Sequence, residues 1–282
     1  MMKPVVAIVA QGAMGSGVAA RLVEHGLEVT TSLAGRSEAS AQRACAAGMR
    51  PVSEEEVVAA DFFLSIVPPG DALSLAQKLA PIIKRGNHKP VYVDCNAVNP
   101  ETAVHIADVI AESGAPFVDA GIIGGPPRRD GYRPAFYASG DAAGRFAALA
   151  EFGLDARVMD GPVGAASAMK MSYAGITKGF TALGAVMMLA ATRAGTAEAL
   201  RQELSQSQPA LLAWLDRQMP QMFSKAYRWV AEMDEIAEFV GNDAVARKIF
   251  EANAALYQRL ARDFEGSQEE IGALAAFTKP QH

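Results

Sequence analysis

A short β-branched run followed at once by a glycine-rich turn restricts the fold of this chain more than any other feature. Val5 to Ala10 is typical of a strand, Gln11 to Gly17 of a tight turn, and Val18 to His25 of an amphipathic helix closed by Gly26. Strand, glycine turn and helix follow one another in this order in the βαβ units that bind dinucleotides. We therefore predict that the chain begins with such a unit.

The glycines of this turn have separate roles. Gly12 lets the backbone approach a pyrophosphate, Gly15 permits close packing of helix on strand, and the helix N-terminus offers free N–H groups to negative charge. The predicted cofactor contacts in the turn are Gly12, Ala13, Met14 and Gly15. Ala10 stands where the usual first glycine would be, so the turn taken alone fits a purely structural role equally well.

The end of the second predicted strand indicates which dinucleotide binds. Residues 27–33 form this strand, and Arg36 and Ser37 follow it. An acidic residue here would bind the ribose hydroxyls of NAD, whereas a guanidinium and a hydroxyl suit the 2′-phosphate of NADP. We predict NADP rather than NAD, although an arginine in a loop is also typical of a solvated surface.

Strand and helix patterns continue to alternate as far as residue 159. Further strands are predicted at 61–67, 91–94, 117–120, 132–139 and 157–159. This alternation predicts the α/β class, with a doubly wound, parallel, Rossmann-type sheet covered by helices on both faces. Ligands bind beyond the carboxyl ends of such strands. The loops expected to line one cleft carry Val67, Pro68, Asn96, Ile123, Gly124 and Gly125.

The pattern changes near Gly161, after which only helices are predicted. We expect a nucleotide-binding domain at 1–162 and an all-helical substrate and dimerisation domain at 163–282, beginning with a long interdomain helix. Residues 161–191 are nearly all small and apolar, yet one sector of roughly 80° carries polar groups. These groups are Lys170, Tyr173, Thr177 and Thr181. The lysine fits either a core helix whose amine reaches solvent or a catalytic role.

The composition of the chain limits the classes of partner that it can bind. The net charge of −5 and the absence of recurring basic clusters argue against a nucleic-acid surface. The two cysteines and four histidines are scattered, so we expect no metal site and a reducing, cytoplasmic location. The apolar run at 179–192 is shorter than the ~20 residues of a membrane span. Its small and apolar side chains need covering, which favours a homodimer.

Several motifs together resemble one family. They are the glycine turn, the pair at 36–37, DCNAVNP at 94–100, DAGIIGG at 119–125 and GPVGAASAMK at 161–170. They resemble the β-hydroxyacid dehydrogenase superfamily, which includes 3-hydroxyisobutyrate and 6-phosphogluconate dehydrogenases, over residues 4–195. The remaining helical region is similar to a divergent, little-characterised subgroup that shares the stretch from Lys170 to Gly179.

This resemblance implies an NADP-dependent oxidoreductase acting on a β-hydroxy or β-keto acid or a related carbonyl. Lys170 would be the general acid–base, with its reference pKa of ~10.4 lowered by burial and by a cationic nicotinamide. Asn96 would position substrate and contact the cofactor, and Tyr173 would support the lysine. The implied substrate-binding residues are Ile123, Gly124, Gly125, Lys170, Tyr173 and Thr177.

The chain also departs from the family. Tyr173 and Ala174 replace a histidine or asparagine and an asparagine, Ile123 replaces a serine, and Glu232 replaces a lysine. We infer a substrate bulkier and less hydrophilic than 6-phosphogluconate. The loop after the two glycines carries three arginines, which fit either contact with an anionic group of the substrate or a solvated loop. They are Arg128, Arg129 and Arg133. An imine reductase and a non-catalytic NADPH sensor remain as alternatives.

Overall fold

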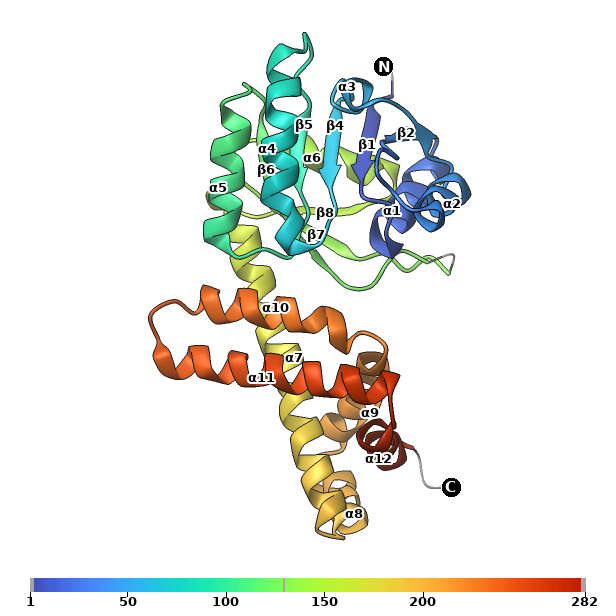
Figure 1. Cartoon of the computed structure of the whole chain (residues 1–282), viewed down its shortest axis with the longest axis vertical. Coiled ribbons are helices and arrows are strands. Elements are labelled where there is room, and N and C mark those ends of the chain that lie inside the picture. The colour runs from blue at the N-terminus through green and yellow to red at the C-terminus, as the bar shows by residue number, and fades with distance from the viewer. Residues whose placement is uncertain (1–2, 129, 280–282) are drawn as a thin grey trace. The chain divides into compact units, whose positions relative to one another are not determined.

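The computed structural model describes residues 3–128 and 130–279. The chain divides into two compact units between Met171 and Ser172, inside helix α7 (Ala165–Arg193) (Figure 1). Each unit has its own secondary structure and its own core. The first contains the sheet, and the second is helical.

The described residues of the first unit form an eight-stranded sheet in the order β3-β2-β1-β4-β5-β6-β7-β8. The strands are β1 (Val5–Val9), β2 (Glu28–Thr31), β3 (Arg50–Pro51), β4 (Phe62–Ser65), β5 (Val91–Asp94), β6 (Phe117–Ile123), β7 (Ala135–Ser139) and β8 (Asp155–Val158). The order reverses between β1 and β4, which creates the crevice where such sheets bind ligands. The predicted Rossmann-type sheet is therefore confirmed.

The expectation of a wholly parallel sheet is wrong at one place. Strand β7 runs antiparallel to β6, while the other neighbouring strands are parallel. The chain returns beside β6 through the loop at 124–134 without a crossover helix, and a direct return of this kind makes the pair antiparallel. The short strand β3 was also not predicted, because its two residues are both exposed and carry no apolar pattern.

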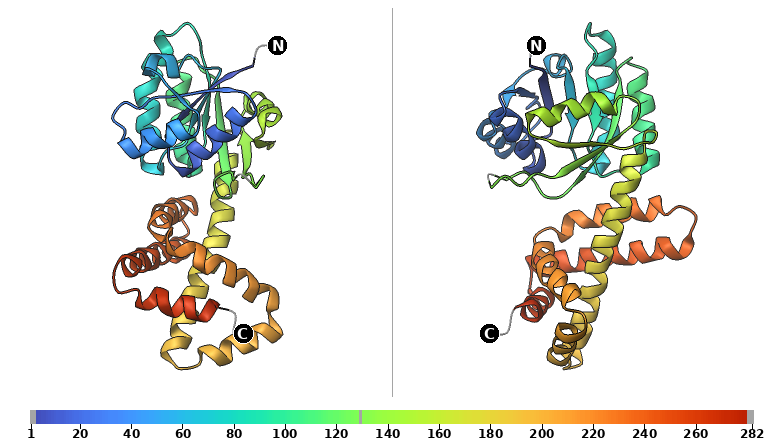
Figure 2. Two further views of the ribbon diagram at one scale, coloured as in Figure 1. Left: turned by 90° about the vertical axis from the view of Figure 1, so that its right-hand side faces the viewer. Right: turned by 180° about the vertical axis from the view of Figure 1, so that it is seen from behind.

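Helices cover both faces of the sheet, as Figures 1 and 2 show. They are α1 (Ala13–Glu24), α2 (Glu38–Ala46), α3 (Glu54–Val57), α4 (Pro69–Arg85), α5 (Pro100–Ala111) and α6 (Ala143–Ala147), which continues into a 3₁₀ turn, η1 (Ala148–Phe152). Ser37, Ser53 and Asn99 cap α2, α3 and α5 by accepting backbone N–H groups. Helix α1 begins earlier than the predicted Val18, since its first turn is built from the glycine-rich segment itself.

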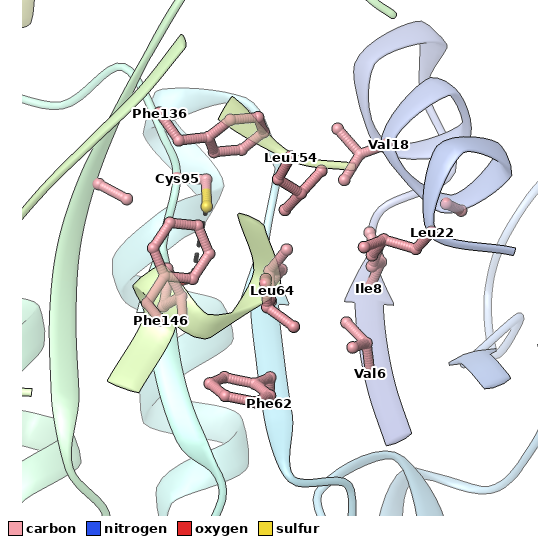
Figure 3. Packing of buried hydrophobic residues seen from close by; sticks show 14 of the residues in the cluster. Val6, Ile8, Val18, Leu22, Phe62, Leu64, Cys95, Phe136, Phe146 and Leu154 are labelled. Atoms are coloured by element: carbon pink, nitrogen blue, oxygen red, sulfur yellow. Dashed lines mark hydrogen bonds between the residues drawn. The ribbon is translucent and has the colours of Figure 1, made fainter. Parts of the chain in front are cut away.

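Two apolar clusters lie on opposite faces of the sheet. Val6 and Ile8 of β1 point to one face, where side chains of α1 and α6 pack in the same cluster (Figure 3). Ala7 of the same strand belongs to the other cluster, beneath α4 and α5. In that cluster the rings of Phe63 and Tyr92 stack with their centroids 4.9 Å apart. Burial of successive residues on both faces is typical of a parallel sheet covered by helices.

The second unit contains most of α7 together with five more helices in its described residues. They are α8 (Ala197–Ser207), α9 (Pro209–Phe223), α10 (Ala226–Phe239), α11 (Ala244–Glu265) and α12 (Glu269–Thr278). Helix α9 continues past Pro220 to Phe223, and the break before α10 falls at Ser224–Lys225. Helices α10 and α11 run side by side (Figure 1).

Small residues of α7 let its neighbours approach closely. A Cβ added to Gly184 would lie 2.7 Å from Leu215 Cδ2 of α9, and one added to Gly175 would lie 3.3 Å from Phe250 Cζ of α11. By length and composition alone α7 is apolar enough to cross a membrane, but 44% of its most apolar window is buried within the fold. These contacts fit the core helix of a helical unit.

Candidate functional site

The glycine turn lies at the crevice between β1 and β4. A Cβ on Gly15 would lie 1.9 Å from the Ala10 carbonyl oxygen, so only glycine fits where α1 packs on β1. At Gly12 no described atom lies within 4 Å of an added Cβ, and no described side chain caps α1. An uncapped helix N-terminus that opens on free space is suited to an anion. The turn therefore fits the pyrophosphate of a dinucleotide.

A buried glutamine fixes the turn against the second strand. Gln11 Nε2 donates to the Ser32 carbonyl oxygen at 3.0 Å and also to Thr31 Oγ1. The Gln11 carbonyl oxygen accepts a 2.7 Å hydrogen bond from Arg43 Nε of α2. Sequence reasoning missed Gln11 and Arg43, because these bonds join residues more than a helix length apart in the chain. They hold the ends of β1 and β2 at a constant separation.

Arg36 and Ser37 lie where the sequence predicts them, in the exposed turn between β2 and α2. Ser37 Oγ accepts the Ser40 N–H at 3.3 Å and so forms the N-cap of α2. Arg43 Nη2 donates to Ser40 Oγ at 3.0 Å. Two guanidinium groups and a helix N-terminus thus surround the end of β2, which is a suitable environment for a phosphate.

Asn96 joins the loops that follow β4 and β5. Its Oδ1 accepts the Val67 N–H at 2.7 Å, and its Nδ2 donates to Ser65 Oγ at 2.9 Å and to Asp94 Oδ1. The side chain is only 3% exposed. Because both amide hydrogens are used inside the protein, Asn96 sets the shape of the loop that carries Val67 and Pro68.

Asp119 fixes the start of helix α7. Its Oδ2 accepts the N–H groups of Gly164 at 2.9 Å and Ser167 at 3.0 Å, and its Oδ1 accepts Ser167 Oγ at 2.7 Å. Ser139 Oγ of β7 also donates to Oδ2, at 3.2 Å. A carboxylate that caps a helix in this way also stabilises the positive end of its dipole. The first turn of α7 is thereby attached to β6 and β7.

This attachment determines where Lys170 lies. A Cβ added to Gly121 of β6 would lie 2.9 Å from the Ala166 carbonyl oxygen and 3.1 Å from Lys170 Cβ. Helix α7 therefore rests directly on β6 at Gly121, and a larger residue there would displace it. The lysine side chain starts one helical turn after the Asp119 cap, at the carboxyl-end edge of the sheet.

The charge of Lys170 acts on the carboxyl group of Asp94. Burial, and then the neighbouring Asp119, raise the pKa of Asp94 to about 7, while the hydrogen bonds from Asn96 and the positive charge of Lys170 oppose this rise. The same lysine opposes the rise that burial causes in the pKa of Cys95. Sequence reasoning did not assign Asp94 or Asp119 a role. Among the described residues, no three His, Cys, Asp or Glu side chains are grouped to hold a metal ion.

The loop after β6 has its own closing contact. Gly124 has φ +123°, and an added Cβ would lie 2.3 Å from Tyr132 Oη, while the Gly125 N–H donates to that hydroxyl at 3.1 Å. Arg128 stacks 4.7 Å over the Tyr132 ring and pairs with Asp130 at 3.3 Å. The loop therefore has a fixed form around Gly124 and Gly125, next to Ile123 at the end of β6. The charge of Arg133 acts on Asp155, and Arg129 lies outside the described residues.

In the helical unit, Tyr173 is exposed and Thr177 Oγ1 donates to its carbonyl oxygen at 2.9 Å. Glu232 pairs with Lys178 of α7, whose amine also lies 5.0 Å from the centre of the Trp229 ring. Burial lowers the pKa of Lys178, and the charge of Glu232 opposes this change. The residue that replaces the family lysine is thus the counterion of a different lysine.

Comparisons with known proteins agree with this arrangement. Residues 5–152 match the NAD-binding domain of 6-phosphogluconate dehydrogenase, and residues 191–260 match a domain of unknown function, DUF1932. An uncharacterized 28.5 kDa protein of Methanothermus fervidus is 30% identical over 184 residues, which are 64% of this chain and 69% of that protein.

Two solved structures extend the similarity over nearly the whole chain. The conserved protein MTH1747, of unknown function and with structural similarity to 3-hydroxyacid dehydrogenases, superposes with a TM-score of 0.71 and 30% identity, covering 93% of this chain and 98% of that one. The 3-hydroxyisobutyrate dehydrogenase of Mycobacterium tuberculosis, solved with L-serine, has a TM-score of 0.66 and 18% identity, covering 93% and 95%. At this lower identity, the similarity to the second structure shows a shared fold and no more.

Proposed function

The chain belongs to the family that carries the NAD-binding domain of 6-phosphogluconate dehydrogenase, and we propose that it is an NADP-dependent oxidoreductase with Lys170 as its general acid–base. Its substrate would be a β-hydroxy or β-keto acid or a related carbonyl compound. Membership of this family supports an NAD(P)-dependent dehydrogenase or reductase. The choice of NADP, the substrate class and the role of the lysine are the parts that we propose.

The preference for NADP is supported by the groups around the end of β2. Arg36 and Ser37 lie in the turn where an acidic residue would select NAD, and Arg43 is held beside them by Ser40. We infer that Gly12, Ala13, Met14 and Gly15 hold the pyrophosphate at the N-terminus of α1. Val67, Pro68 and Asn96 would form the next part of the cofactor site, at the crevice between β1 and β4.

The observation that carries the catalytic assignment is the position of Lys170. The Asp119 cap and the close approach at Gly121 fix this lysine at the carboxyl-end edge of the sheet, where the predicted cofactor loops also end. When bound, the nicotinamide supplies or accepts the hydride. Lys170 would give its ammonium proton to a carbonyl oxygen during reduction and take the hydroxyl proton during oxidation. Ile123, Gly124 and Gly125 would bound the substrate beside it.

Tyr173 and Thr177 follow Lys170 along α7, and we propose that they complete the substrate site. Their phenol and hydroxyl replace the amide groups of better-known relatives. Ile123 replaces a serine that would bind a carboxylate, and Glu232 is neutralised by Lys178. These substitutions favour a substrate that is bulkier and less hydrophilic than 6-phosphogluconate.

The test separates cofactor binding from chemistry. NADPH binding is measured by the change in its fluorescence, and turnover is measured with β-keto acids, β-hydroxy acids and cyclic imines. Lys170→Ala should bind NADPH with wild-type affinity and lose turnover by at least about a thousandfold, as expected for loss of a proton-transfer group together with its charge. Lys84→Ala, in α4, is the matched control and should behave as wild type.

Retained turnover in Lys170→Ala would remove the lysine from the mechanism. Turnover of cyclic imines alone would identify the imine reductase alternative. NADPH binding by the wild-type protein without turnover of any compound would favour the sensor alternative.

We further propose that the protein is a cytoplasmic homodimer. One side of α7 exposes Ile176, Phe180, Leu183 and Met187, which lie one or two helical turns apart in a single stripe. A shallow groove runs between this stripe and α11, and Ile249 of α11, which is 54% exposed, lines it together with Ile176, Phe180 and Leu183. A second copy of the chain would cover this stripe by packing its own α7 there, because a two-fold interface brings the same surface from both subunits together.

A further inference from the structure

Four polar residues form a row across the sheet, and the one on β6 lies two residues before Gly121, where an added Cβ would be 3.1 Å from Lys170 Cβ. Ser65 of β4, Asp94 of β5, Asp119 of β6 and Ser139 of β7 are successive register partners. Each is at most 1% exposed. We call these residues the polar row. Parallel strands covered on both faces are normally apolar throughout, so the row is a specific exception near their carboxyl ends.

Both oxygens of Asp119 in the polar row are hydrogen-bonded, but one oxygen of Asp94 is not. Asp119 accepts four hydrogen bonds, from Ser139, Gly164 and Ser167. Asp94 Oδ1 accepts one from Asn96, whereas Asp94 Oδ2 is buried with no hydrogen-bond partner among the described residues. A buried carboxylate oxygen without a partner is costly and normally has a specific reason.

Several titratable groups face Asp94. They are Asp119 on β6, Tyr92 on its own strand, Cys95 directly after that strand, and Lys170 on α7. Lys170 is the cation among the groups that act on the Asp94 carboxyl, and it lowers the pKa that burial and Asp119 raise to about 7. By reciprocity, the ionised Asp94 carboxylate must stabilise the protonated amine of Lys170 to the same extent.

We propose that Asp94 is a positioning residue that acts through Lys170: its carboxylate holds the amine at the cofactor edge of the sheet and determines the pH at which the lysine exchanges its proton. The inference rests on the proposed function of Lys170. Asp119 cannot take this role, because its oxygens are already used in capping α7. Asn96 and Ser65 orient Asp94 from the side opposite to Asp119.

The titration of Lys170 can be observed without substrate or turnover. The full-length protein is labelled with ¹³Cε-lysine, and the Lys170 resonance is assigned by its absence in Lys170→Arg. Asp94→Asn keeps the shape of the side chain and removes the charge, so the titration midpoint of Lys170 should fall by roughly one to three pH units. Asp155→Asn is the matched control, since it removes a carboxylate of the same sheet that is not among the groups acting on Asp94, and it should leave the midpoint unchanged.

An identical Lys170 midpoint in wild type and Asp94→Asn would overturn the proposal. If Asp94→Asn fails to fold, the wild-type titration decides, since ionisation of Asp94 should produce a second, smaller inflection of the Lys170 resonance near pH 7. Its absence would also overturn the proposal. Because these measurements need no substrate, they are independent of the Lys170→Ala turnover test. In an active enzyme, Asp94→Asn should also move the alkaline limb of the reduction rate to lower pH by the same amount.

Discussion

Asp94 and Asp119 are register partners on β5 and β6, and both carboxyl groups are buried in the sheet. The oxygens of Asp119 cap the N-terminus of α7. They accept hydrogen bonds from four donors, three at the start of α7 and one on Ser139 of β7, which stabilise the charge of the carboxylate. Burial, and then the neighbouring Asp119, raise the pKa of Asp94, so its carboxyl binds a proton far more readily than an exposed aspartate does. Its contribution to stability therefore depends on the pH.

The Asp94 carboxyl should make the protein less stable as the pH rises from about 4 to about 7. Its folded-state pKa of about 7 lies above the ordinary aspartate value of 3.8, so within this interval the unfolded chain ionises while the folded chain stays protonated. The free energy of unfolding of Asp94→Asn, measured relative to that of wild type, should therefore be higher at pH 8 than at pH 4.5. The difference should be at most about 4 kcal/mol. Calorimetric unfolding at the two pH values measures this difference.

Asp155→Asn is the control for the sign of this effect. The hydrogen bonds from Arg157 lower the pKa of Asp155, so its contribution is present at high pH and is lost as the pH falls. This variant should be weakened to nearly the same extent at pH 8 and pH 4.5, and less below about pH 4, where the unfolded chain takes up its proton. A pH-independent effect of Asp94→Asn would contradict a raised pKa.

The two glycines of the nucleotide turn should respond differently to alanine. Gly15→Ala should destabilise the first unit by more than about 2 kcal/mol, because its Cβ would overlap the Ala10 carbonyl oxygen. Gly12→Ala should fold normally, since its φ of −73° suits alanine and its Cβ points into open space. It should nevertheless weaken NADPH binding, which a fluorescence titration measures. Unchanged binding in Gly12→Ala would show that the cofactor does not approach this backbone.

Arg36→Ala should change the selectivity between the two dinucleotides. Loss of a charge-assisted hydrogen bond to a 2′-phosphate should raise the Kd for NADPH about tenfold to a hundredfold and leave the Kd for NADH within about twofold. Arg50→Ala removes an exposed arginine that pairs with Glu28 at 2.6 Å in the same unit, and it should affect neither cofactor. Equal losses for both dinucleotides would show that Arg36 does not read the phosphate.

Charge on the exposed face of α7 should prevent association of the subunits. Phe180→Glu combined with Leu183→Glu should give a monomer in sedimentation velocity, since a two-fold interface would bring these charges close to their copies. Val104→Glu places a charge on an exposed apolar site of α5 and should leave the assembly unchanged. A wild-type protein that sediments as a monomer at all concentrations would contradict the proposed dimer.

Much of the first unit could be predicted from local patterns. The glycine turn, the β-branched strands and the alternation with helices correctly indicated the Rossmann-type sheet and the helical region after it. The motifs from 94 to 170 correctly indicated the family. The reversal at β7 was missed, because periodicity shows that a strand exists but not the direction in which it pairs.

The sequence by itself determined the fold class, since strand and helix periods, turn glycines and capping residues act over a few neighbouring positions. It also led to the prediction of Lys170 and of the loops expected around it, because these residues occur in contiguous motifs. Only the tertiary structure decided that Asn96 joins two loops, that Asp119 caps α7 and that Asp94 is buried beside Asp119 and within the field of Lys170. Hydrogen bonds and charges depend on distance in space, and strand pairing brings together residues that the chain keeps far apart.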